Sequence, residues 1–238
     1  TNLVGSKEEI LYVKGSGWDL VSIEKDGFSP VRMSHILKLS KLKALSDPQM
    51  VNELKTQLTN AASPTPSVET ILHAILPFKY VDHTHADAVV TISNTLDGEE
   101  RIREIYGNRV VIIPYVMPGF DLAKEVGRLF SEMASDETEG MVLLNHGIFS
   151  FGSTARKSYD RMIDLVNLAE QYLVSQNACD NEEIVSNIKS KKIRNDVSQL
   201  RQKVSSVAGN PVLLNLTNSK LGASFSNRKD VEKIATRG

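Results

Sequence analysis

The stretch from residue 140 to residue 151 places the strongest constraint on how this chain can fold. It reads GMVLLNHGIFSF and contains two short apolar runs, Gly140 to Leu144 and Ile148 to Phe151, on either side of the tripeptide NHG (145–147). Short apolar runs bounded by turn residues are typical of buried strands, and a short glycine-containing connection predicts a hairpin. The stretch therefore predicts a buried β-hairpin that carries a histidine in its turn.

Further strands and amphipathic helices are predicted on the N-terminal and C-terminal sides of this hairpin. Apolar strands are expected at Glu9 to Val13 and Arg109 to Val116. Apolar residues at helical spacing predict helices at Asp121 to Met133 and Thr154 to Val174. Shorter or weaker helical patterns cover Pro30 to Leu45, Val51 to Leu58 and Ala86 to Ser93.

The C-terminal quarter of the sequence differs in character from the rest. A polar helix is predicted at Asn181 to Val207, a strand at Pro211 to Leu216 and a basic helix at Ser226 to Gly238. Apolar positions are sparse in this part, so it is not expected to belong to the first core. We therefore predict one domain over residues 1–176. Residues 177–238 are expected to form an extension that leads to a region outside this chain.

Composition excludes several functional classes. A hydrophobic content of 41% and a charged content of 24% are ordinary for a globular protein with a core. A formal net charge of −1 gives no electrostatic field for nucleic acid or an anionic membrane. No apolar run is long enough to span a bilayer, and no signal peptide is recognisable. The single cysteine, Cys179, cannot form an internal disulfide, which favours a cytoplasmic protein.

The stretch from Pro66 to Asp87 carries half of a candidate metal site. Thr65 as N-cap and Pro66 as first residue predict a helix that holds Glu69. In the strand that follows, side chains two residues apart point to the same face, so His83 and His85 are expected to project together. Two imidazoles on one face are half of a zinc site, although such a pair often fills a half-buried surface.

His146 is the natural third imidazole, because the end of a buried strand is where α/β folds expose functional groups. Glu69 would then be the fourth ligand or a nearby base. The spacing differs from the HExxH pattern of metalloproteases, which disfavours peptide hydrolysis. The other two histidines, His35 and His73, are expected to be surface or packing residues.

The turn Gly15-Ser16-Gly17 follows the first predicted strand. Its backbone N–H groups could hold an anion, or it could be a plain turn. A dinucleotide fingerprint would need glycine at Leu20, so a dehydrogenase site is not predicted within this chain. Lys14 could approach a phosphate, but a lysine beside a strand end is usually solvated.

Five separated motifs together carry a resemblance to a known family. GSG (15–17), PSVETILH (66–73), DHTH (82–85), IPY (113–115) and NHG (145–147) occur in the order found in the class II aldolase/adducin head family. The longer matches VKGSGWDL (13–20) and IPYVMPGF (113–120) look most like the aldolase domain of bifunctional rhamnulose-1-phosphate aldolase/short-chain alcohol dehydrogenase proteins.

The resemblance implies a fold and a set of functional residues. The expected fold is a three-layer α/β domain whose central, mainly antiparallel sheet has helices on both faces, followed by the C-terminal extension. Glu69 matches an acidic residue that ligates zinc at rest and shuttles a proton. Tyr115 matches a tyrosine that acts as acid/base in the site of a neighbouring subunit, which implies a homo-oligomer such as a tetramer. The implied zinc ligands are His83, His85 and His146, and the implied phosphate-binding residues are Ser16, Gly17 and Ser67.

Two departures from the family pattern concern the phosphate pocket. Val68 stands where sugar-phosphate aldolases of the family often have a second serine. The glycine-rich G-N-T-S segment that normally precedes the first strand is not present in the printed sequence and is expected upstream of Thr1. The phosphate pocket is therefore incomplete in this sequence.

The implied activity is zinc-dependent cleavage of a ketose 1-phosphate, with L-rhamnulose 1-phosphate giving dihydroxyacetone phosphate and L-lactaldehyde. The partner is thus a small sugar phosphate. Two alternatives remain open: a zinc-dependent epimerase, decarboxylase or dehydratase of the same fold, and a non-catalytic adducin-like interaction module. The second would predict missing histidines, whereas His83, His85 and His146 are all present.

Overall fold

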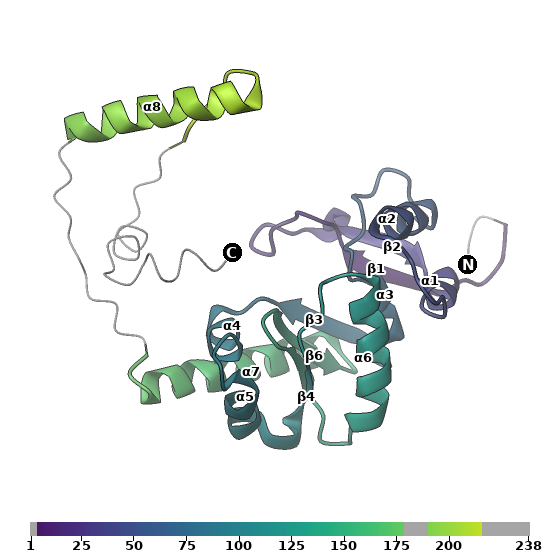
Figure 1. Ribbon diagram of the computed structural model, residues 1–238. Helices are drawn as coiled ribbons and strands as arrows, with labels where there is room; N and C mark the ends of the chain where they lie inside the picture. The colour runs from purple at the N-terminus through teal and green to yellow at the C-terminus, as the bar shows by residue number, and fades with distance from the viewer. Residues whose placement is uncertain (1–3, 179–189, 216–238) are drawn as a thin grey trace. The chain divides into compact units, whose positions relative to one another are not determined.

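The computed structural model describes residues 4–178 and 190–215 (Figure 1). The chain divides into two compact units, residues 1–176 and 177–238, and each is considered by itself below. No helix within the described ranges is both long enough and apolar enough to cross a membrane.

A four-stranded sheet forms the centre of the first unit, in the order β3-β6-β5-β4. The pairs β3–β6 and β6–β5 are antiparallel and the pair β5–β4 is parallel, so the sheet is mainly antiparallel as expected. The predicted hairpin is confirmed as β5 and β6. The strands are β3 (Tyr80–Thr84), β4 (Val110–Ile113), β5 (Gly140–Leu143) and β6 (Gly147–Gly152).

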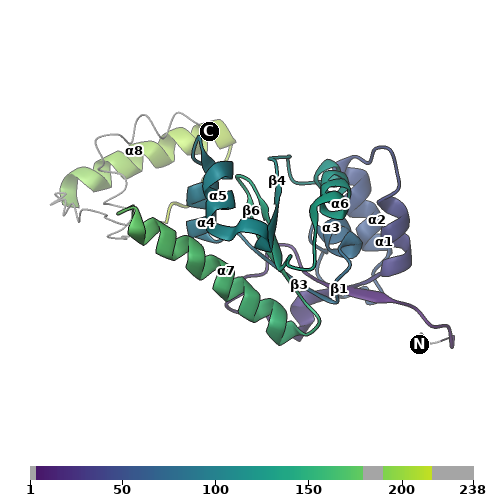
Figure 2. The same ribbon diagram turned by 90° about the horizontal axis from the view of Figure 1, so that it is seen from below.

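Both faces of this sheet are covered, and β4, β5 and β6 are buried at every position. In β4, Val111 and Ile113 pack into one core together with helices α3 and α6, whereas Val110 and Ile112 pack into a second core with α4, α5 and α7. Alternate residues of a strand point to opposite faces, so continuous apolar strands need two cores. Figure 1 and Figure 2 show α3 and α6 on one side of the sheet and α4, α5 and α7 on the other. The three-layer α/β fold is confirmed.

The helices of the two layers agree in position with most of the predicted patterns. The long amphipathic helices are found within one residue of their predicted starts. On the first face lie α1 (Met33–Leu39), α2 (Asp47–Thr56), α3 (Thr70–Ile75) and α6 (Phe120–Met133). On the second face lie α4 (Asp87–Ser93), α5 (Gly98–Tyr106) and α7 (Ala155–Ser175).

A separate two-stranded sheet precedes these layers. It pairs β1 (Ile10–Lys14) with β2 (Phe28–Arg32), and a single-turn 3₁₀ helix, Lys25–Gly27, leads into β2. The helix predicted from Pro30 therefore begins only at Met33. A proline within a strand is tolerated where the strand lies at the edge of a sheet, which is the position of β2.

Two further predictions are corrected by the structure. The helix expected from Pro66 begins at Thr70, because Pro66 forms a bridge with Gly15 and is extended. The strand expected as far as Val116 ends at Ile113, before Pro114. A second single-turn 3₁₀ helix, Gly107–Arg109, leads into this strand.

In the second unit, α8 (Ser190–Ala208) agrees with the C-terminal half of the predicted polar helix. Residues 211–215, predicted as a strand, are not in a strand. The basic helix expected from Ser226 lies outside the described residues.

Candidate metal centre

The hairpin turn between β5 and β6 positions His146. The three residues between the strands, 144–146, close the turn with Asn145 in the left-handed conformation (φ 59°), which asparagine adopts more readily than most residues. Asn145 N donates a hydrogen bond of 3.2 Å to Ser93 Oγ, which ties the turn to the end of α4. His146 therefore lies in the turn of a hairpin whose two strands are buried.

The edge strand β3 presents His83 beside this turn. His83 lies opposite Phe149 of β6, and the two rings stack with their centroids 4.0 Å apart. His83 Nδ1 donates to Ile148 O at 3.0 Å, because a carbonyl oxygen only accepts. In the neutral imidazole with this hydrogen bond, Nδ1 carries the hydrogen and Nε2 has a free lone pair. Fixing the ring in this way is typical of metal-ligating histidines.

The three imidazoles predicted as ligands converge on one point. β3 ends at Thr84, so His85 lies just beyond the strand rather than within it. Its ring nevertheless lies beside that of His83, with centroids 4.9 Å apart, and beside that of His146, at 4.8 Å. The rings of His83 and His146 are 5.3 Å apart.

Glu69 completes the cluster from the opposite side. It caps the N-terminus of α3, and its backbone N donates to Ser67 Oγ at 3.2 Å. Its Oε1 lies 3.3 Å from His83 Nε2 and 3.2 Å from His146 Nε2. One ligand atom from each of Glu69, His83, His85 and His146 lies within 4.8 Å of all the others.

This donor set fits a divalent metal ion. Three imidazole nitrogens and a carboxylate oxygen are a ligand combination that zinc takes in proteins. Within the described part of the chain, Glu69 Oε1 and His83 Nε2 are buried and have no hydrogen-bond partner, despite their proximity. Buried polar atoms without a partner are costly, and a cation between these two would satisfy both. The geometry therefore supports a metal site.

The charge states of the cluster also suit a metal ion. Burial raises the pKa of Glu69, but the imidazoles of His146 and His83 lower it by more, so the pKa lies well below its usual range. Glu69 is therefore ionised at neutral pH. Burial, together with His83 and His146, lowers the pKa of His85, which stays neutral. An ionised carboxylate and a neutral imidazole are the forms that bind metals.

Gly147 is a site residue that the sequence interpretation used only as part of a turn. A Cβ at this position would lie 2.6 Å from Thr84 O and 3.0 Å from both His83 Cε1 and His85 Cδ2. The absence of a side chain therefore lets the two histidines and the hairpin approach each other. The motif NHG contains this glycine, but only the three-dimensional arrangement shows what would collide with a side chain.

Replacing Gly147 by alanine is expected to displace the His83 and His85 rings and to weaken metal binding by about 10- to 100-fold, the effect typical of a disturbed ligand orientation. The measurement is a competitive titration with a chromogenic zinc chelator. Gly127→Ala is the matched control, since Gly127 is exposed on α6 and its Cβ would meet only the flexible end of Ile75, at 3.3 Å. Equal metal affinity in the two variants would contradict this role for Gly147.

His73 packs against the centre without joining it, as the sequence interpretation expected. The centroids of the His73 and Phe149 rings are 5.6 Å apart. Burial, and then the proximity of His83, lowers the pKa of His73 to about 4. The ring is therefore neutral in the folded protein at pH values where an exposed histidine is protonated.

This pKa predicts a loss of stability in acid. The folded-state pKa of His73 lies below its unfolded value of 6.5. The contribution of the neutral His73 ring to the free energy of unfolding is therefore fully present above pH 6.5 and is lost as the pH falls towards 4. We expect metal-free protein to lose at most about 3 kcal/mol of unfolding free energy relative to His73→Phe across this window. Urea unfolding at pH 7, 5.5 and 4 measures the difference, and a constant difference would contradict the prediction.

Hydrogen bonds connect the segments that carry Glu69 and the residues predicted to bind phosphate. Ser16 N donates to Thr65 O at 2.8 Å, and Ser67 N donates to Lys14 O at 3.1 Å, so the turn at 15–17 is tied to the segment before α3. Gly17 adopts a φ of 77°, which favours glycine. Val68, in contrast, is 41% exposed and offers no donor.

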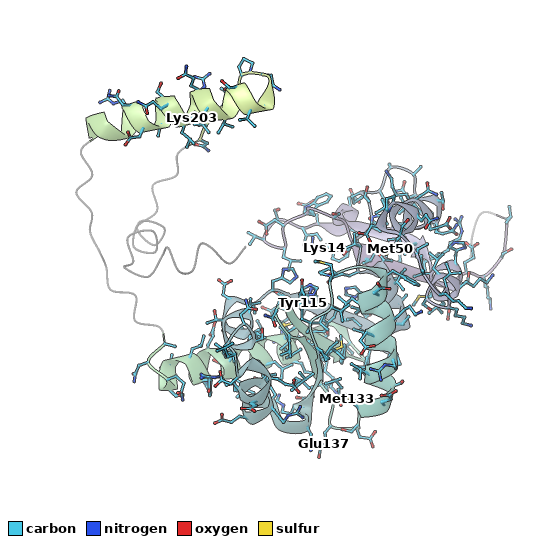
Figure 3. All side chains as sticks on the ribbon, viewed as in Figure 1. Lys14, Met50, Tyr115, Met133, Glu137 and Lys203 are labelled. Atoms are coloured by element: carbon cyan, nitrogen blue, oxygen red, sulfur yellow. The ribbon has the colours of Figure 1, made fainter. Side chains whose placement is uncertain are left out.

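The side chain of Tyr115 is largely exposed to solvent. This residue follows β4 on the loop before α6, its side chain is 53% exposed, and its hydroxyl donates to Met117 Sδ at 3.7 Å (Figure 3). The action of Tyr115 in the site of a neighbouring subunit stays a prediction.

The fold and the cluster together define a class: an α/β protein with a candidate divalent-metal site beside a hairpin turn. The chain belongs to the family described as the class II aldolase and adducin N-terminal domain, whose model matches residues 3–173.

Two relatives share more than a third of their aligned residues with this chain. It is 44% identical to the N-terminal class II aldolase domain of a conserved protein from Thermoplasma acidophilum, with a TM-score of 0.63, over 69% of this chain and 75% of that one. It is 38% identical over 170 residues to the uncharacterized oxidoreductase YuxG of Bacillus subtilis (strain 168). That match covers 71% of this chain and 24% of YuxG, so the chain spans about a quarter of the length of this curated relative.

A more distant match shows the fold alone. A sugar-phosphate aldolase from Thermotoga maritima is 16% identical, with a TM-score of 0.50, and the match covers 73% of each chain.

Proposed function

We propose that this protein cleaves a ketose 1-phosphate, with L-rhamnulose 1-phosphate as the substrate that the motifs favour. The observation that carries the proposal is the convergence of three histidines and Glu69 on one point. Family membership supports aldol chemistry in general, and the choice of sugar rests on the motif resemblance. Zinc bound by His83, His85 and His146 would act as a Lewis acid on the carbonyl and hydroxyl oxygens of the substrate.

The chain's own residues supply the proton transfers. In the cleavage direction, the hydroxyl next to the scissile carbon–carbon bond loses its proton to Tyr115, which accepts it as the phenolate and later releases it to solvent. The bond breaks, and the aldehyde leaves. The electron pair of that bond stays with the carbon of the triose phosphate. Glu69, which is ionised in the free protein, takes up a proton from solvent and delivers it to that carbon. In the condensation direction Glu69 removes this same proton, and its lowered pKa favours the ionised form that this step needs.

Binding of the phosphate is assigned to Ser16, Gly17 and Ser67, which share one framework with Glu69. The exposure of Tyr115 supports a homo-oligomer in which this residue enters the site of a neighbouring subunit. The test is an assay of the purified, zinc-loaded protein with L-rhamnulose 1-phosphate and L-fuculose 1-phosphate, coupled to glycerol-3-phosphate dehydrogenase. No triose phosphate from either sugar, with zinc bound, would sink the proposal.

A second candidate is another zinc-dependent reaction on the same site, namely epimerisation, decarboxylation or dehydration of a sugar phosphate. Val68 favours this reading, because it offers no hydroxyl where a serine is common among sugar-phosphate aldolases. Substrate profiling by NMR separates the two, since only aldol cleavage yields two carbonyl products. A non-catalytic interaction module is disfavoured by the complete ligand set.

A further inference from the structure

We propose that Ser93 is a positioning residue of the metal centre: it fastens helix α4 to the hairpin turn and so sets the separation of the ligands His85 and His146. The inference rests on the metal site that the proposed function uses. It goes beyond the ligand set, because it concerns a serine at the end of α4 that acts through the backbone of the turn.

The ring of His146 has less support from its own hydrogen bonds than the ring of His83. His83 Nδ1 donates to Ile148 O at 3.0 Å, and a contact of this kind fixes the orientation of a ligating imidazole. His146 Nδ1 is buried, and within the described part of the chain it has no hydrogen-bond partner. The placement of His146 therefore depends on the backbone of the turn that carries it.

One of the three N–H groups of this turn is satisfied by a side chain. Leu144 N and His146 N donate to backbone carbonyl oxygens, at 3.0 and 3.2 Å. Asn145 N, between them, donates to Ser93 Oγ at 3.2 Å. Asn145 is left-handed, with a φ of 59°, and a residue in this conformation persists only where the surrounding contacts over-determine it. The Ser93 hydroxyl supplies one of these contacts.

Ser93 is itself held in a fixed position. It is only 3% exposed, and its Oγ donates to Val90 O at 3.3 Å, so that the lone pairs of this oxygen are free to accept from Asn145 N. The backbone is closely packed here as well, because a Cβ at Gly98 of α5 would lie 2.5 Å from Ser93 O. The hydroxyl is therefore a fixed acceptor for the turn.

Helix α4 connects this acceptor to a second metal ligand. The helix begins at Asp87, two residues after His85, and ends at Ser93. It shares the second core with the hairpin through a set of buried apolar residues: Ala88, Val89, Ile92, Val142 and Ile148. Packed or hydrogen-bonded segments thus form a closed path from His85 through α4 and the turn to His146. Loss of the Ser93 hydroxyl opens this path at its one side-chain contact with Asn145 N.

The test is the binding of Co²⁺, which takes the same nitrogen and oxygen ligands as Zn²⁺ and has a visible absorption that reports the geometry of its ligands. Ser93→Ala is expected to raise the Kd for Co²⁺ by about 10-fold or more, within the range typical of outer-shell partners, and to change the visible spectrum of the bound ion. Ser93→Thr keeps the hydroxyl and should restore both. Ser93→Cys keeps the volume but accepts hydrogen bonds weakly, so it should behave like Ser93→Ala.

Thr138→Val is the matched control. Thr138 is 7% exposed, and its hydroxyl also accepts from a backbone N–H, that of Ser135, at 2.9 Å. It precedes the first residue of β5, whereas the turn with His146 follows the last. Thr138→Val should lower the free energy of unfolding in urea about as much as Ser93→Ala does, yet keep the wild-type Kd and spectrum.

Three results would overturn the proposal: wild-type Co²⁺ binding in Ser93→Ala, an equal loss of affinity in Thr138→Val, or wild-type binding in Ser93→Cys. Because Co²⁺ binding needs no substrate, the measurement also separates this proposal from the proposed function. If Ser93→Ala binds Co²⁺ more weakly than the wild type and no aldol activity is found, the role of Ser93 stands and the aldol reaction fails. If aldol activity is found and both proteins bind Co²⁺ equally, only the proposal for Ser93 fails.

Discussion

Replacing His83 by alanine is expected to abolish zinc binding at the cluster and, with it, turnover. The side chain contributes a nitrogen whose lone pair is bare, because the other ring nitrogen donates to Ile148 O. Loss of an outer-shell partner alone costs about 10- to 100-fold in metal affinity, so loss of a ligand should cost at least about 100-fold. Metal content after dialysis against a zinc buffer, measured by mass spectrometry, reports the effect directly.

His35→Ala is the matched control for this experiment. His35 lies on α1 and pairs with Glu53 of α2 at 2.8 Å, outside the cluster. The His35→Ala variant should keep one zinc ion per chain and full activity. This result would exclude a general effect of removing an imidazole. If His83→Ala retained the metal with wild-type affinity, the assignment of His83 as a ligand would be wrong, whether or not the variant was active.

The sequence was sufficient to predict the layers of the fold but not its edges. Continuous apolar strands and amphipathic helices carry their own periodicity, which is why β5, β6, α6 and α7 were predicted closely. The helix starts predicted at Pro30 and Pro66 were wrong because the conformation of both prolines depends on residues that are distant in the sequence. Pro30 pairs across to β1, and Pro66 bridges to Gly15, neither of which is visible in local spacing.

The same distinction holds for the candidate site. Chemistry-bearing residue types at a strand end, such as His83 and His146, can be found from one sequence. Residues that act through space or through burial cannot. Gly147 matters because of atoms more than fifty residues away in sequence, at Thr84 and His83.

Replacing Glu69 by glutamine is expected to separate metal binding from proton transfer. Glutamine keeps an oxygen near His83 and His146 but cannot accept the proton that the proposed reaction moves. The three imidazoles should still hold zinc, with an affinity reduced by the loss of one negative charge. Removal of a general acid or base typically slows turnover by about 10²- to 10⁴-fold, and kcat should fall within that range.

The decisive readout for Glu69→Gln is a half-reaction that needs no second substrate. When dihydroxyacetone phosphate is incubated with zinc-loaded protein in D₂O, the wild type should exchange one carbon-bound hydrogen for deuterium, which NMR detects. The exchange requires a base at the carbon that Glu69 is proposed to protonate, so Glu69→Gln should abolish it while keeping zinc. Glu53→Gln, which alters a carboxylate paired with His35, should exchange at the wild-type rate. Undiminished exchange in Glu69→Gln would assign the proton transfer to another group and leave Glu69 as a ligand only.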